Sequence, residues 1–176
     1  KTISEESLTI TGELTPYNYE INLPSGWFIL GYLHQEINDA GNMMDPIYEN
    51  LTILKDYLGN VYWPMFGINT IGTMEPGKGY QIKIINPFTY SYPDGNSARY
   101  GDIYLERPVH FEEPTNTGNN MTVGLPLTSW ESTPSIGDEI AAYGEDGELI
   151  GSTTFQGDHI ALTIWGDDLT TDKKDG

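Results

Sequence analysis

Residues 53–84, ILKDYLGNVYWPMFGINTIGTMEPGKGYQIKI, decide the expected fold because they read as a strand, a tight turn, a second strand, a loop and a third strand. The first turn contains Gly59, which has no Cβ and can adopt a positive φ. The second turn contains Pro76 and Gly77, and the run 80–84 that follows alternates apolar and polar residues. A period of two is typical of a strand with one buried face. The stretch therefore predicts a β-sheet.

Strand patterns also occur before and after this stretch. The run 27–33, WFILGYL, is apolar on both faces, as expected of the central strand of a packed sandwich. Residues 38–44 are expected to form a loop. One short helical turn is predicted after it, because Asp45 is a capping residue and Pro46 suits the first helical position. The other predicted strands are 8–10, 103–105, 119–125, 138–143, 149–155 and 159–165.

The two halves of the chain follow a related strand order. Three features recur in the same sequence: the strands 27–33 and 121–125, the strand pairs around Gly59 and Gly147, and the strands 80–84 and 161–165. We therefore predict an all-β fold of two sandwich-like modules with at most one short helix.

The predicted modules are residues 1–85 and residues 86–176, and the second begins with a linker interrupted by several prolines. No closing strand follows the acidic tail, so the second module is expected to be truncated. Two alternatives follow. Either the natural chain continues, or the strand 8–10 pairs with the sheet of a neighbouring module or subunit.

The 176-residue chain is strongly acidic, with 8 Lys and Arg against 26 Asp and Glu and a net charge of -18. Such a chain repels phosphate backbones and anionic lipids, so neither nucleic acid nor a membrane surface is an expected partner. No apolar run reaches the length of a membrane-spanning helix, so insertion into a membrane is not expected either. The chain has no cysteine, which excludes disulfides, thiolate metal sites and a cysteine nucleophile.

The first half resembles a β-rich repeat of large secreted and surface proteins of Bacteroidetes in the segments GWFILGYL, ILKDYLGNVYWPMFGINTIG and PGKGYQIKI. The second half resembles the module that follows that repeat, in the segments NNMTVGLP, IGDEIAAYGEDGELIGS and ALTIWGDDLTTDKKDG. The resemblance extends over residues 8–176. It implies an exported, multidomain parent protein of the type IX secretion cargo class. It implies no reaction, because these modules accompany other domains and have no assigned catalytic residue.

Motifs of catalysis do not occur in the sequence. There is no GxSxG elbow, no HExxH and no phosphate-binding loop. His34, His110 and His159 are isolated and lack the spacing of metal ligands. The 26 acidic residues offer carboxylate pairs everywhere, so such a pair carries no information about glycoside hydrolysis. We therefore expect a non-enzymatic protein.

The acidic run 167–176 is the strongest metal candidate in the sequence. Calcium binds six to eight hard oxygen ligands, which flexible loops rich in Asp and Thr supply. The predicted ligands are Asp167, Asp168, Asp172 and Asp175. The spacing is not that of an EF-hand, and two lysines offset part of the charge. The alternative to a calcium site is therefore a solvated acidic loop.

Four aromatic residues are candidates for ligand binding: Tyr62, Trp63, Trp130 and Trp165. Aromatic faces can stack on the apolar faces of pyranose rings, which would make these residues a platform for polysaccharide. The alternative is that they are core or edge aromatics of the sandwich, because strands favour such residues.

The function expected from these observations is that of a non-catalytic extracellular structural, adhesion or spacer module of a larger secreted or surface protein. Neighbouring modules or subunits would join it through sheet edges. The first alternative is a carbohydrate-binding module, and the second is an accessory domain of a secreted hydrolase.

Overall fold

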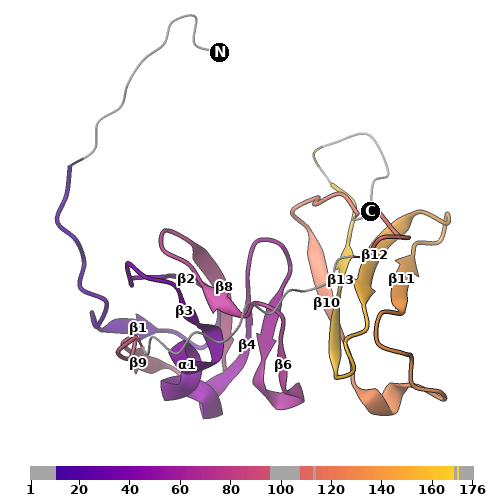
Figure 1. The fold of residues 1–176 in the computed structure, drawn as a ribbon. Coiled ribbons are helices and arrows are strands. Elements are labelled where there is room, and N and C mark those ends of the chain that lie inside the picture. The colour runs from indigo at the N-terminus through magenta and orange to yellow at the C-terminus, as the bar shows by residue number, and fades with distance from the viewer. Residues whose placement is uncertain (1–10, 96–107, 113, 169, 171–176) are drawn as a thin grey trace, which may run out of the picture.

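A computed structural model describes residues 11–95, 108–112, 114–168 and 170. They form two groups of strands that lie side by side (Figure 1). The first group comprises β1 (Ile21–Leu23), β2 (Gly26–Gly31), β3 (Asn38–Asp39), β4 (Leu51–Lys55), β5 (Val61–Trp63), β6 (Ile68–Asn69), β7 (Thr73–Met74), β8 (Gly79–Ile84) and β9 (Phe88–Tyr90). The second comprises β10 (Asn120–Leu125), β11 (Glu139–Tyr143), β12 (Leu149–Thr154) and β13 (Ile160–Trp165). The predicted all-β fold is confirmed.

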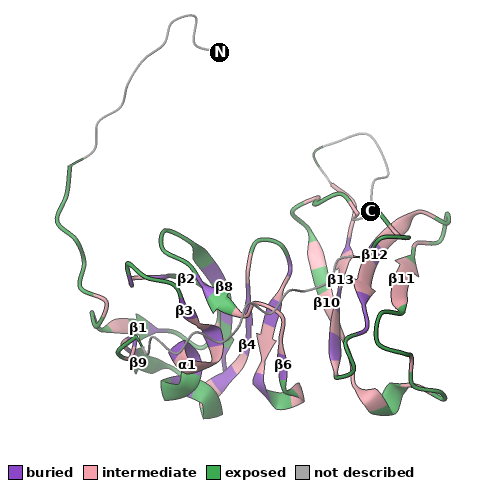
Figure 2. Cartoon of the chain, viewed as in Figure 1, coloured by how far each residue is buried: buried purple, intermediate pink, exposed green. Residues whose placement is uncertain are grey.

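The first group is built on a five-stranded sheet with the strand order β2-β8-β4-β5-β6, in which every pairing is antiparallel. The alternation predicted for 80–84 is present in β8, where Tyr80, Ile82 and Ile84 are buried and the residues between them are exposed (Figure 2). The buried residues face the larger of two apolar cores. β8 is therefore the strand that gives the sheet an inner and an outer face.

The expectation that 27–33 forms a central strand buried on both faces is wrong. β2 lies at the edge of the five-stranded sheet, and β8 is its only partner within it. Leu30 is buried in the core, whereas Trp27 and Ile29 on the other face are exposed. An apolar run shows that a strand is suited to burial, but it does not show whether a second layer covers both faces.

A short helical segment packs against the inner face of the sheet. It consists of α1 (Ala40–Met44) followed directly by the 3-10 helix η1 (Asp45–Asn50). The helical turn predicted at Pro46 is thus present, but the loop predicted for 38–44 is wrong. Asp39 caps α1, because its Oδ1 accepts the Asn42 N–H at 2.8 Å. No side-chain cap occurs at η1, so Asp45 does not have the predicted capping role.

The strand β9 and the residues after it belong with the first group. β9 pairs with β1, and Tyr90 and Tyr92 lie buried in the core behind the sheet. The Tyr90 hydroxyl donates to the Met43 carbonyl at 2.7 Å, and the Tyr92 hydroxyl donates to the Gly31 carbonyl at 3.0 Å. The module boundary expected at residue 85 therefore falls between two strands that both pack into the first group.

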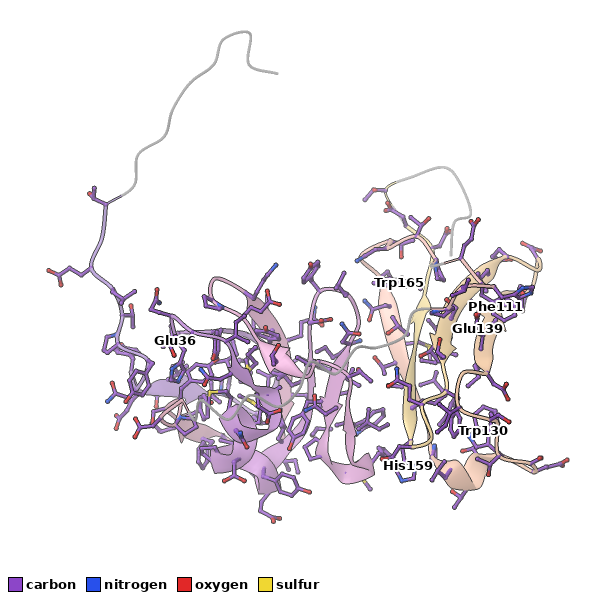
Figure 3. All side chains as sticks on the ribbon, viewed as in Figure 1. Glu36, Phe111, Trp130, Glu139, His159 and Trp165 are labelled. Carbon is purple, nitrogen blue, oxygen red and sulfur yellow. The ribbon has the colours of Figure 1, made fainter. Side chains whose placement is uncertain are left out.

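The second group pairs β10 with β13 over six residues, and β11 with β12. The 3-10 turn η3 (Leu127–Ser129) follows β10, and η2 (Pro64–Phe66) follows β5 in the first group. Glu139 on β11 holds the incoming chain, because its carboxylate accepts backbone N–H groups of residues 109–111 at 2.7–2.9 Å (Figure 3). The second group therefore includes the segment that leads into it.

The related strand order predicted for the two halves is present only in part. The first hairpin joins the sheet through β4, which pairs with β8, whereas β11 and β12 form a separate two-stranded sheet. β2 pairs with β8, and β10 pairs with β13. The two hairpin turns also close alike: the Asp56 N–H donates to the Asn60 carbonyl at 3.0 Å, and the Gly144 N–H donates to the Glu148 carbonyl at 2.9 Å. Gly59 and Gly147 occupy the same place in these turns, with φ of 89° and 84°.

Two predicted strands, 8–10 and 103–105, lie outside the described residues. So do Asp172 and Asp175 of the acidic run. In the part of the chain that the structure describes, no helix is long and apolar enough to cross a membrane.

Candidate binding face on the five-stranded sheet

The second group of strands covers one half of the outer face of the five-stranded sheet. This covered face consists of Ile53, Lys55, Val61 and Trp63 on β4 and β5. Ile53 and Val61 are buried together with Ile68, and Ala161 of β13 packs against this cluster. Residues of β4 are consequently buried on both faces, since Leu54 on the inner face is fully buried as well.

Hydrogen bonds between described residues cross from one group to the other. The Lys55 Nζ donates to the Asn120 Oδ1 at 2.6 Å, and the Thr163 hydroxyl donates to the Gly59 carbonyl at 2.9 Å. The side-chain amide of Asn116 donates to the Tyr57 carbonyl at 3.1 Å. Burial lowers the pKa of Lys55, and the neighbouring carboxylate of Asp56 acts in the opposite direction. The ammonium group of Lys55 is therefore held in the interface by an amide oxygen.

Glycines allow the two groups to approach closely. A Cβ on Gly124 of β10 would lie 3.3 Å from the ring of Trp63. A Cβ on Gly59 would lie 2.6 Å from the side chain of Thr163, and the positive φ of Gly59 disfavours any other residue as well. The interface therefore requires glycine at positions 59 and 124, because a larger side chain at either position would collide with the other group.

The other half of the outer face is left exposed by the described residues. This open face consists of Trp27 and Ile29 on β2 and of Gln81 and Lys83 on β8. The strand register places Trp27 opposite Lys83 and Ile29 opposite Gln81. Trp27 is 53% exposed and Ile29 is 76% exposed, and the Lys83 Nζ lies 5.7 Å from the centre of the Trp27 ring. Trp27 is thus an exposed indole on a paired strand, with the ammonium group of Lys83 over its ring.

A second lysine and a second aromatic ring lie at one end of the sheet. The Lys78 Nζ is 4.9 Å from the centre of the Tyr57 ring, and Tyr57 is 61% exposed. Lys55, Lys78 and Lys83 are the only Lys or Arg residues in the described part of the chain. Two of them therefore contact exposed aromatic rings on this sheet, and the third is buried in the neighbouring interface.

The four predicted ligand-binding residues are not brought together on an exposed surface. Trp165 is 6% exposed, and Trp63 lies in the interface with its ring edge-on to Phe66. Tyr62 packs against the inner core, where burial raises the pKa of its hydroxyl. Trp130 is half-buried and lies far from Trp165 along the second group (Figure 3). Among the described residues, these four side chains are therefore packed against the protein and do not form one exposed aromatic platform.

Trp27 was not among the predicted ligand-binding residues, although it is the exposed tryptophan of the chain's described part. A signal was present in the sequence. The alternation in 80–84 predicts that Gln81 and Lys83 share the exposed face of their strand. What the sequence did not supply was the register that places Trp27 and Ile29 opposite them on β2.

The predicted metal ligands are only partly described. Asp168 accepts the backbone N–H of Thr170 at 2.8 Å and its hydroxyl at 2.6 Å, and these bonds lower the pKa of the Asp168 carboxyl. Among the described residues, no three or more His, Cys, Asp or Glu side chains are grouped so that they could hold a metal ion. Calcium at Asp167, Asp168, Asp172 and Asp175 remains a prediction.

Each histidine has a structural contact. The Nε2 of His34 lies 2.9 Å from the Pro93 carbonyl oxygen, and His34 is buried. The Nδ1 of His159 accepts the Leu127 N–H at 2.9 Å. The ring of His110 packs edge-on against the ring of Phe111.

Comparisons of the chain with protein-family models, with curated proteins and with solved structures found no match.

Proposed function

We propose that the chain is a non-catalytic structural or adhesion module of a larger secreted or surface protein, in which two β units act as one rigid piece. The observation that carries this proposal is the covered face. Ile53 and Val61 are buried between the units, and Lys55 bonds to Asn120 across them. An interface that buries apolar side chains and a lysine resists bending, unlike a flexible linker.

The extracellular placement rests on the sequence resemblance and on the acidic composition. A net charge of -18 keeps a surface protein soluble and discourages binding to phosphate backbones. Edge strands give such a module a way to join its neighbours. In the described part of the chain, β11 pairs with no strand other than β12, and we infer that its other edge accepts a strand from a neighbouring module or subunit.

The test of rigidity is whether the two units tumble together. NMR relaxation of backbone amides should give one rotational correlation time for β8 and for β13. Two separate correlation times would count against the proposal, because independent units respond as smaller bodies. A variant in the covered face, Gly124→Leu, should separate the two values, since its side chain would collide with the Trp63 ring.

A further inference from the structure

We propose that the open face (Trp27, Ile29, Gln81 and Lys83) binds a chain of an acidic polysaccharide, with a sugar ring stacked on Trp27 and its carboxylate beside Lys83. This inference deepens the adhesive role proposed above. It rests on the half of the sheet that the second group of strands does not cover, so the two proposals depend on different residues.

The open face lies on two strands that are paired along their whole length. β2 and β8 are paired without a shift in register from Gly26 to Gly31, so the backbone beneath the four side chains is held by a complete antiparallel ladder. Gly31 and Gly79 lie opposite each other at one end of this ladder, and the Ile29 side chain lies against Gly79. The Lys83 Nζ lies over the Trp27 ring, so a sugar would stack on the ring face that Lys83 does not cover.

The charge of the open face favours an anionic ligand. The protein carries a net charge of -18, yet both exposed lysines of its described part, Lys78 and Lys83, lie at this sheet. Repulsion from distant carboxylates is screened beyond about 8 Å at physiological ionic strength. A carboxylate held within hydrogen-bond distance of Lys83 is therefore attracted locally, and Gln81 can donate to neighbouring hydroxyl groups.

The size of the open face argues against a folded protein or a second copy as the occupant. Six residues span about 20 Å, and two strands are about 10 Å wide, which gives roughly 200 Å². One side of a standard protein interface covers about 800 Å². The second group of strands already occupies β4, so the open face cannot extend in that direction. A single extended polymer chain fits these limits.

Binding is tested with polygalacturonate as the probe and dextran as the neutral control, using the full chain in affinity electrophoresis and titration calorimetry. Trp27→Ala should weaken binding to polygalacturonate roughly tenfold or more, because a tryptophan at the centre of a contact carries much of its affinity. Lys83→Gln should weaken it several-fold and reduce its dependence on salt. The matched control is Tyr143→Ala on β11, which removes an aromatic ring of similar exposure, 56%, from the second group.

The proposal is overturned if the full chain does not bind polygalacturonate, or if it binds dextran equally well. Equal binding by Trp27→Ala and Tyr143→Ala would also overturn it. Light scattering that shows a dimer dissolved by Trp27→Ala would identify a second copy as the occupant instead. The melting temperature of each variant, measured alongside, separates loss of binding from loss of fold. None of these outcomes depends on whether the two units tumble together.

Discussion

The Nζ of Lys55 lies 2.6 Å from the Oδ1 of Asn120, and this bond joins two strands that are 65 residues apart in the sequence. Lys55 is 7% exposed. A buried ammonium group is costly unless an acceptor compensates it, so the amide oxygen of Asn120 decides whether this lysine is tolerated.

The two residues should therefore respond differently to substitution. Asn120→Ala should lower the free energy of unfolding by about 2 kcal/mol, because a hydrogen bond to a charged group is lost and the ammonium stays buried. Lys55→Met should cost less, since it removes the charge together with its need for a partner. Urea denaturation measures both values. A larger loss for Lys55→Met than for Asn120→Ala would contradict this account of the interface.

Gly59 and Gly147 occupy equivalent places in the two hairpin turns, so substituting each of them tests the contact between the first turn and Thr163 of the second group. Gly147→Ala should cost about 1 kcal/mol, because alanine disfavours the positive φ while nothing lies within 4 Å of its Cβ. Gly59→Ala should cost about 2–4 kcal/mol, because it adds a collision with Thr163 of the second group to the same φ strain. The difference between the two unfolding free energies measures the collision. Equal costs would show that β13 does not press against this turn.

Substitution of the buried Trp165 should destabilise the fold, whereas substitution of the exposed Trp27 should not. Trp165→Ala should lower the free energy of unfolding by about 3–5 kcal/mol, as expected for truncating a buried tryptophan. Trp27→Ala should change it by less than about 1 kcal/mol, because the ring is 53% exposed. Thermal and urea unfolding of both variants check this. A Trp27→Ala protein as unstable as Trp165→Ala would mean that Trp27 is covered in solution.

Alkaline pH should destabilise the protein through its buried tyrosines, of which Tyr90 and Tyr92 have the most strongly raised pKa values. Burial raises the pKa of both Tyr90 and Tyr92 above the ordinary value of 10.0. The folded state thus keeps protons that the unfolded state loses, so stability is intact below pH 10 and falls above it. The expected slope is about 1.4 kcal/mol per pH unit for each group.

Urea denaturation between pH 8 and pH 11 measures this slope. Tyr90→Phe should lower the slope by the share of one group, although the bond to the Met43 carbonyl is lost as well. The remaining slope comes from Tyr92 and from Tyr32, Tyr62 and Tyr80, whose pKa values are also raised by burial. Lys55 acts with the opposite sign, since burial lowers its pKa, and its share is read from the Lys55→Met variant. Stability that does not change up to pH 11 in the wild type would mean that neither tyrosine is protected from solvent.

Local sequence patterns were sufficient for several elements. The period of two in 80–84 identified β8 together with its buried face, and the glycine turns identified both hairpins. Order alone identified one correspondence between the halves, because β2 and β8 pair as β10 and β13 do, but it did not place the hairpins. Alternation and turn chemistry act over a few residues, so they can be read without knowing the rest of the fold.

The positions of these strands in the molecule required the tertiary structure. The apolar run of β2 predicted a central strand, but its place at the sheet edge left Trp27 and Ile29 exposed and made them the open face. Trp63, predicted as a surface platform, lies in the interface between the two groups instead. The pattern of a strand states which residues share a face, whereas the partner that covers this face comes from a distant part of the chain.

Lys55 shows most clearly which properties follow from the sequence alone and which require the tertiary structure. The sequence by itself determined that Ile53 and Lys55 lie on one face of a strand, since they are two residues apart. Only the tertiary structure decided that this face is buried, because Asn120 and Ala161 are brought onto it from the second group. Burial is a property of the contacts between strands, and those contacts here join residues 65 positions and more apart.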